Sequence, residues 1–116
     1  YQLEGDITVK IQEEGEAVEV PIQAGEMYLH PAKVPHSPIR SEGSVGLVIE
    51  RKREADHKDG LEWYCDSCNY KLHSTYFHLT NIEKDFLPRF REFYGSKALR
   101  TCKNCGHVME TDPRFI

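Results

Sequence analysis

The chain has 116 residues, of which 39% are hydrophobic and 29% charged, and its formal net charge is −4. This length is typical of one domain, since domains usually contain about 100–200 residues. The excess of acidic over basic residues offers no basic surface to nucleic acid or anionic lipid. The longest apolar run, Val45–Ile49, is far shorter than the ~18–20 residues of a membrane span. Composition therefore predicts a soluble, globular, mildly acidic protein that binds neither nucleic acid nor membrane.

The beginning of the chain is also informative. Tyr1 is not a methionine, and the first residues already alternate like a strand that runs into a turn. No charged and apolar leader of a secretory signal peptide follows. We therefore expect a cytoplasmic protein, and we expect that further residues precede Tyr1.

Residues 1–51 are predicted to be all β. Apolar and polar residues alternate in pairs of segments separated by glycine-containing turns, which is typical of half-buried strands. The last apolar segment is apolar on both faces until Glu50, as expected of a strand buried on two sides. Short strands at such regular spacing suggest a sandwich or barrel. The predicted strands cover 7–12, 18–22, 27–29 and 45–51, and a stiff proline-bounded loop covers 31–38.

The second half begins with a polar segment, 52–60, which is predicted to be a linker with a solvated surface. A strand is expected at 75–79 and a short helix at 86–94. In this helix Pro88 would occupy the first turn, where its missing N–H costs nothing, and Gly95 would end the helix. The aromatic residues of the helix share one face, which predicts packing between the barrel and the metal-binding part: Phe86, Phe90, Phe93 and Tyr94.

The cysteines form two C-x-x-C pairs, Cys65 with Cys68 and Cys102 with Cys105. Two such pairs in a small domain are typical of a tetrahedral thiolate metal site, because a tight turn presents both sulfurs of a pair to one ion. The residues that follow the pairs, Asn69 and Gly106, tolerate the positive φ that such turns often need. Two disulfides in a secreted protein are the alternative. Four thiolates suit zinc or a single iron ion, so the spacing predicts a metal without identifying it.

The segment 25–40 carries the densest cluster of candidate functional residues. A glycine turn, a strand and a proline-rich loop place His36 on a backbone with little freedom, which suits a metal ligand. Taken alone, His36, like His30, is more often an ordinary hydrogen-bonded histidine. Glu50 ends an apolar strand, so its carboxylate needs a partner or a cavity. Together with Arg40 it could grip a zwitterionic ligand.

These residues resemble known sequences in two ways. Gly25, Pro31 and His36 have the spacing of the second cupin motif, although Lys33 and Arg40 replace its second glycine and its asparagine. More specifically, the chain resembles the 3-hydroxyanthranilate 3,4-dioxygenase family, in the short variety with a rubredoxin-like metal site. The likeness covers nearly all 116 residues and rests on residues 1–5, 36–40, 47–51 and 62–65 together with the two C-x-x-C pairs.

The resemblance implies a fold and a set of boundaries. The fold would be mainly β: a cupin-type double-stranded β-helix, or jelly-roll barrel, with a small C-terminal four-cysteine knob and one short helix. Residues 1–51 would form the C-terminal portion of the barrel, and 61–116 a rubredoxin-like extension packing on it. The family suggests a homodimer.

The resemblance also implies a chemistry, in which non-haem Fe(II) and O2 open the ring of 3-hydroxyanthranilate to a muconate semialdehyde, on the route to quinolinate and NAD. Two histidines and one glutamate hold the iron, and His36 would be the last of them. Arg40 would bind the substrate carboxylate. Glu50 would accept a hydrogen bond from the ring amino or hydroxyl group and help remove the hydroxyl proton. The four cysteines would hold zinc or iron in a second, structural site.

One departure limits what these residues could do alone. The other histidine and the glutamate belong to the first cupin motif, and if Gly5 closes that motif, the glutamate lies two residues before Tyr1. The 116 residues would then supply one of three iron ligands. Two other functions stay open: a non-catalytic cupin whose zinc knuckles dock a protein, and an electron carrier with a rubredoxin-like iron.

Overall fold

The computed structural model describes residues 1–115. Backbone contacts divide the chain into two units, Tyr1–Lys52 and Arg53–Ile116. As predicted, the regular structure is mostly β and the four cysteines cluster, features consistent with a small cupin-like β domain. The predicted segment boundaries at 51 and 61 stay a prediction.

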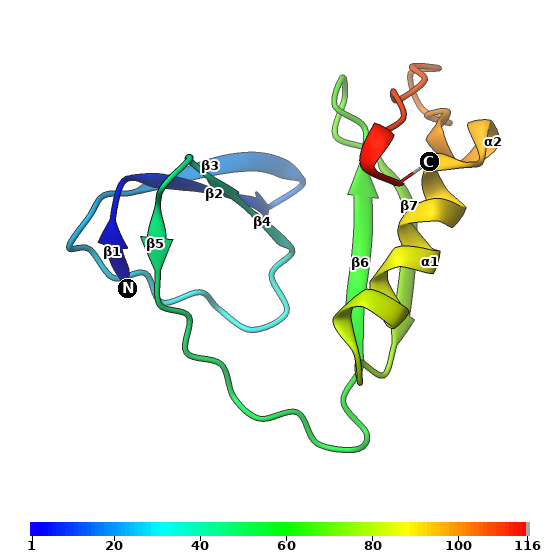
Figure 1. The fold of residues 1–116 in the computed structure, drawn as a ribbon. Helices are drawn as coiled ribbons and strands as arrows, with labels where there is room; N and C mark the ends of the chain where they lie inside the picture. The colour runs from blue at the N-terminus through cyan, green and yellow to red at the C-terminus, as the bar shows by residue number, and fades with distance from the viewer. Residues whose placement is uncertain (116) are drawn as a thin grey trace. The chain divides into compact units, whose positions relative to one another are not determined.

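The elements of the two units are coloured along the chain in Figure 1. The first unit contains β1 (Gln2–Glu4), β2 (Ile7–Glu13), β3 (Glu16–Ile22), β4 (His36–Arg40) and β5 (Val45–Gly46). The second unit contains β6 (Asp59–Tyr64), β7 (Lys71–Phe77), α1 (Ile82–Tyr94), α2 (Lys97–Arg100) and the 3-10 turn η1 (Pro113–Phe115).

The first unit has a three-stranded antiparallel sheet in the order β3-β2-β4 and a two-stranded sheet of β1 and β5 (Figure 1). β2 and β3 pair along their whole length, and their two-residue connection, Glu14 and Gly15, has φ of 50° and 80°. Positive φ at both positions is the type I′ geometry that matches the twist of paired strands. The alternating apolar residues predicted to be buried form the core of this unit: Ile7, Val9, Ile11 and Ile22.

Two strands predicted for the first unit differ from the structure. Residues 27–29 form no strand, and the predicted strand 45–51 is limited to Val45–Gly46. Beyond it, Leu47 still exchanges two backbone hydrogen bonds of 2.8 Å with Tyr1, but Leu47, Val48 and Ile49 are 53, 60 and 87% exposed. The prediction that this run is buried on both faces is wrong within residues 1–115, because a two-stranded sheet does not cover it.

In the second unit, α1 packs on one face of the antiparallel pair β6–β7. The aromatic face predicted for the helix forms the core of this unit. Phe93 is fully buried and stacks on Trp63 with ring centroids 4.7 Å apart, and Phe86 meets Phe77 edge-to-face at 5.5 Å. These contacts all lie within the second unit.

The helix α1 begins at Ile82, four residues before its predicted start. Asn81 is the N-cap, and its side-chain oxygen accepts a hydrogen bond of 3.0 Å from the Lys84 N–H. The Asp85 carboxylate accepts the backbone N–H groups of Thr80 and Asn81, at 2.8 and 2.9 Å. Because these two side chains satisfy amides that have no partner within the helix, the helix extends upstream of its aromatic face.

Other boundaries of the second unit also shift. Pro88 lies inside α1 instead of in its first turn, whereas Gly95 ends the helix as predicted. A second short helix, α2, was not predicted. The strand predicted at 75–79 is β7, Lys71–Phe77, and β6 begins within the predicted linker. Among the described helices, none combines the length and apolar character that crossing a membrane requires.

Candidate functional site

The four cysteines meet in the second unit, and all their Sγ atoms lie within 4.8 Å of one another. The Sγ–Sγ distance is 3.6 Å between Cys65 and Cys105, and 3.5 Å between Cys68 and Cys102. A tetrahedral site with metal–sulfur bonds of about 2.3 Å separates its sulfurs by about 3.8 Å, whereas a disulfide bond is about 2.05 Å long. The arrangement thus fits one metal ion held by four thiolates and does not fit the disulfide alternative, since all four cysteines are unbridged.

Both cysteine pairs lie in the same kind of turn. In the first, the Cys65 N–H donates to the Tyr70 carbonyl and the Asn69 N–H donates to the Cys65 carbonyl, both at 2.8 Å. In the second turn, the Cys102 N–H donates to the His107 carbonyl at 2.8 Å and the Gly106 N–H donates to the Cys102 carbonyl at 2.9 Å. Asn69 and Gly106 have φ of 63° and 79°, which confirms the prediction of positive φ. Each turn buries its first cysteine and exposes its second.

Polar groups around two of the sulfurs shift their pKa values. The Asn104 side-chain amide donates to Cys68 Sγ at 3.5 Å, and this bond, with the backbone at Tyr70, lowers the pKa of Cys68 to about 6. At Cys105, the backbone of His107 lowers the pKa, but desolvation and the neighbouring thiols outweigh it and raise the pKa to about 11. Because metal ions bind thiolates, metal binding must displace the proton of a thiol whose pKa is raised, as at Cys105.

A side-chain contact also links the two turns. His107 Nε2 lies 2.7 Å from the Asp66 carboxylate, and the Asp66 N–H donates to Met109 Sδ at 3.3 Å. These contacts hold one cysteine turn against the other without requiring a metal ion. The C-x-x-C spacing gives no sign of them.

His36 is the first residue of β4 and lies directly opposite Ile11 of β2. Residues directly opposite in an antiparallel pair point to the same face, so His36 shares the apolar face of β2. Its Nδ1 lies 3.3 Å from the Val34 carbonyl oxygen. Because a carbonyl can only accept, this hydrogen bond requires the hydrogen on Nδ1, which in the neutral imidazole leaves the lone pair on Nε2. The exposed His36 can thus offer one nitrogen to a metal ion.

One donor does not make an iron site by itself. Within residues 1–115, the groups of three or more potential ligands are the four cysteines and an exposed cluster of Glu54, Asp56 and His57. His36 belongs to neither group. The imidazole therefore fits iron as a single ligand, and the described residues do not complete the set.

Arg40 ends β4 opposite Ile7, on the same face as His36. Its guanidinium lies next to Gly46 of β5, in the other sheet of the unit. A methyl group added to Gly46 would lie 3.2 Å from Arg40 Nη1. The same methyl group would lie 2.9 Å from the side-chain oxygen of Gln2, which is 3% exposed. Gly46 thus leaves room for the Arg40 guanidinium beside β1 and β5.

Glu50 lies on the exposed segment that follows β5. Its predicted context, the end of a doubly buried strand, is wrong for the reason given above. The segment does lead from Gly46, which is next to the Arg40 guanidinium. The iron-binding role of His36 and the substrate-binding roles of Arg40 and Glu50 stay predictions.

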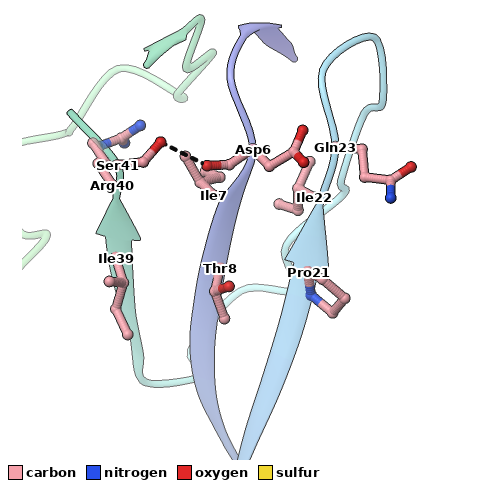
Figure 2. A pocket seen from close by; sticks show the side chains of 9 residues that line it. All are labelled: Asp6, Ile7, Thr8, Pro21, Ile22, Gln23, Ile39, Arg40 and Ser41. Atoms are coloured by element: carbon pink, nitrogen blue, oxygen red, sulfur yellow. Dashed lines mark hydrogen bonds between the residues drawn. The ribbon is translucent and has the colours of Figure 1, made fainter. Parts of the chain in front are cut away.

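A hollow of about 320 Å³ lies at the end of the three-stranded sheet where β2 begins and β3 and β4 end. Thr8 lies opposite both Pro21 and Ile39, and Figure 2 shows these side chains along the hollow. At its end the Ser41 hydroxyl donates to the Asp6 carbonyl at 2.9 Å (Figure 2). Arg40 also borders this hollow, together with Ile7 and Ile22, whereas His36 does not line it.

Comparison with known proteins identifies the family. A model of the 3-hydroxyanthranilic acid dioxygenase family matches residues 1–94. The chain belongs to this family. The matched range includes His36, Arg40, Glu50 and the first cysteine pair, and it ends before the second pair.

Curated relatives extend this family match to nearly the whole chain. A protein named 3-hydroxyanthranilate 3,4-dioxygenase from Xanthomonas euvesicatoria pv. vesicatoria (strain 85-10) is 55% identical over 115 residues, 99% of this chain and 65% of the relative. Proteins of the same name from Jannaschia sp. (strain CCS1) and Bacillus thuringiensis (strain Al Hakam) are 47 and 42% identical over 93 and 94% of the chain, which cover 61 and 62% of those relatives. The chain thus spans somewhat less than two thirds of the length of these relatives.

Three contacts with the predicted site residues are not evident from the sequence. His30 lies against His36, Gly46 against Arg40, and Asn104 against Cys68. Each contact joins different strands, loops or turns, so no spacing along the sequence marks it. Only His30 had a visible signal, since it is a histidine in the same dense segment as His36.

Proposed function

We propose that this chain belongs to an enzyme that opens the aromatic ring of 3-hydroxyanthranilate with O2, by extradiol-type cleavage to 2-amino-3-carboxymuconate semialdehyde. The observation that carries the proposal is the 55% identity, over 99% of the chain, to a relative named for this reaction. The common face of His36 and Arg40 on β4 supports it. The reaction would stand in the kynurenine route to quinolinate and NAD.

His36 is proposed as one of three protein ligands of Fe(II). Its Nδ1 faces the Val34 carbonyl, which leaves Nε2 as the donor atom. The second histidine and the glutamate would come from outside these 116 residues, as the greater length of the relatives allows. When bound, Fe(II) would bring substrate and O2 together and lower the pKa of the substrate hydroxyl.

Arg40 is proposed to bind the substrate carboxylate. A guanidinium suits this role because its planar fork can donate two parallel hydrogen bonds to one carboxylate. Glu50 is proposed to accept a hydrogen bond from the ring amino or hydroxyl group and to take the hydroxyl proton. Both residues would orient the ring relative to His36 Nε2.

The four-cysteine cluster is proposed to hold zinc or iron in a structural role. Its Sγ–Sγ distances of 3.5 and 3.6 Å fit either metal. Four unbridged cysteines also favour a reducing compartment, which supports the cytoplasm as the location. We expect the enzyme to be a homodimer, as the family resemblance suggests.

The test uses a protein that carries this sequence at the length of its relatives. Loaded with Fe(II), it should consume 3-hydroxyanthranilate and O2 in equal amounts, measured by absorbance and an oxygen electrode. His36→Ala should lose bound iron and activity, whereas the exposed control His78→Ala should keep both. Full activity of His36→Ala would contradict the proposal.

The role of Glu50 needs its own variant. Glu50→Gln should lower kcat because an amide cannot take the hydroxyl proton, while the iron content stays normal. A wild-type kcat would remove Glu50 from the reaction. A protein with one bound zinc and no ring cleavage would favour the docking module instead.

A further inference from the structure

His30, which has no role in the proposed reaction, lies against the proposed iron ligand. The ring centroids of His30 and His36 are 4.1 Å apart, and the rings are tilted by 47°. His30 is half-buried, and its Nδ1 is buried with no hydrogen-bond partner within the described part of the chain. His36 is exposed. One histidine thus packs inside the unit and supports the other at its surface.

Both histidines have a ring nitrogen within hydrogen-bond distance of the same carbonyl oxygen, that of Val34. His30 Nε2 lies 2.8 Å from the Val34 oxygen, and His36 Nδ1 lies 3.3 Å from it. A carbonyl has two lone pairs and can only accept, so each of these nitrogens carries a hydrogen. In the neutral imidazoles, His30 then has its lone pair on the buried Nδ1, and the exposed residue His36 has its lone pair on Nε2.

The shared carbonyl is fixed by the core of the first unit. Val34 packs against the buried cluster of β2 and β3, and the next residue, Pro35, accepts the Gln12 N–H of β2 at 3.1 Å. The Tyr28 ring also neighbours the His30 ring, with ring centroids 5.9 Å apart. Among the described residues, the one hydrogen-bonding contact of the His36 ring is the long one of 3.3 Å to the Val34 carbonyl, at the limit of a hydrogen bond. The orientation of its ring therefore depends on the neighbouring His30 ring.

We propose that His30 is a positioning residue for His36. By holding the Val34 carbonyl and the flank of the His36 imidazole, it keeps His36 in the Nδ1–H tautomer with Nε2 directed away from the core. The inference rests on the proposed function only for what Nε2 binds. Partners of ligating histidines typically change metal affinity by about 10–100-fold, and His30, which acts through a shared carbonyl and a ring contact, is expected to change it about tenfold.

The first test reads the tautomer of His36 without any iron. Long-range ¹⁵N–¹H spectra of the histidine side chains, recorded on the 116-residue chain, should show hydrogen on His36 Nδ1. His30→Leu removes the donor and the ring, and it should give a mixture of both His36 tautomers. His30→Gln keeps an N–H donor for Val34 and should retain more of the Nδ1–H form. The control His57→Gln should change nothing at His36.

Two results would overturn the inference. One is hydrogen on Nε2 of His36 in the unaltered chain, and the other is a His36 tautomer that is unchanged in His30→Leu. If His30→Leu does not fold, His30→Gln decides whether the His30 ring positions His36. If this variant has the same His36 tautomer distribution and the same Fe(II) affinity as the unaltered protein, the ring has no positioning role.

The second test measures Fe(II) affinity by competition with a chelator, in the protein at the length of its relatives. His30→Leu should weaken Fe(II) binding about tenfold and His30→Gln less, whereas His36→Ala should abolish binding. If His36→Ala still binds Fe(II), the proposed function fails while the tautomer result stands independently. If His36→Ala loses Fe(II) but His30→Leu binds it normally, the inference about His30 alone fails.

Discussion

The two units of the chain assemble their candidate metal ligands in opposite ways. In the second unit, two turns of four residues bring four sulfurs within 4.8 Å of one another. In the first, His36 stands on β4 with a shared carbonyl and a ring beside it, but in no group of three ligands among residues 1–115. A metal site built from turns can therefore be predicted from the short spacing of its ligands along the sequence. A site built across strands takes one donor from each of several distant segments.

The largest mutational effect is expected at Cys65, a candidate ligand in the cysteine cluster that is 2% exposed. Cys65→Ser should release the metal and unfold the second unit, because thiolate–zinc binding contributes on the order of 10–16 kcal/mol in zinc-finger peptides. Metal analysis and the near-UV circular dichroism of Trp63 measure both effects. Ser67→Ala, in the same turn, should change neither. A variant that melts normally yet loses turnover would instead assign the cluster to the reaction.

The next largest effect is expected in the aromatic core, and it tests whether the metal alone stabilises the second unit. Phe93→Ala removes the fully buried ring that stacks on Trp63, and it should cost about 3–5 kcal/mol in the free energy of unfolding. Urea denaturation of the metal-loaded protein measures this cost. Ile82→Ala on the same helix, 65% exposed, should cost less than about 0.5 kcal/mol. Equal costs for the two variants would show that the aromatic core is dispensable.

The first unit is tested at Arg40. Arg40→Ala should raise KM about 10–100-fold, because a hydrogen bond to a charged group is worth about 1.5–3 kcal/mol. Gly46→Ala should raise KM less, since its methyl group would displace Arg40 Nη1 and the Gln2 side chain without removing the guanidinium. Lys10→Ala, whose side chain lies on the other face of β2, is the control. Steady-state kinetics with unchanged KM in Arg40→Ala would remove Arg40 from the site.

The smallest of these effects concerns Asp85 at the start of α1. Backbone N–H groups of Asn81 and Thr80 hold the pKa of the Asp85 carboxyl below its ordinary value. A lowered folded-state pKa stabilises the fold above the unfolded-state pKa of about 3.9, and the contribution disappears as the pH falls through the folded-state value. Asp85→Asn should therefore weaken the dependence of thermal stability on pH below about pH 4. Glu83→Gln is the matched control, and identical pH profiles for Asp85→Asn and the unaltered protein would contradict the prediction.

The predictable parts of the fold are those in which neighbours in sequence are neighbours in space. Alternation over 7–12 and 18–22 predicts β2 and β3 because a two-residue turn pairs them directly. The C-x-x-C spacing predicts the cysteine cluster, and the residues after the pairs predict its two positive φ angles. In each case one short segment contains nearly all of the determining contacts.

The parts that could not be predicted depend on contacts between distant residues. The run Leu47–Ile49 is apolar like a buried strand, but the described sheet leaves it exposed. A first-turn position for Pro88 predicts too late a start for α1, because Asn81 and Asp85 cap the helix upstream. The contact of His30 with His36 depends on where the loop 31–35 places the Val34 carbonyl, which no periodicity describes.

Pro88 has a consequence for the internal motion of α1. It has no N–H to donate to the Lys84 carbonyl, so the hydrogen-bond ladder is interrupted between the capped first turn and the turns that carry Phe93. The segment before Pro88 can therefore fray on its own, while Phe93 keeps the rest of the helix closed. Amide hydrogen exchange should be fast at 85–87 and slow at 92–94, which would divide one helix into two cooperative parts.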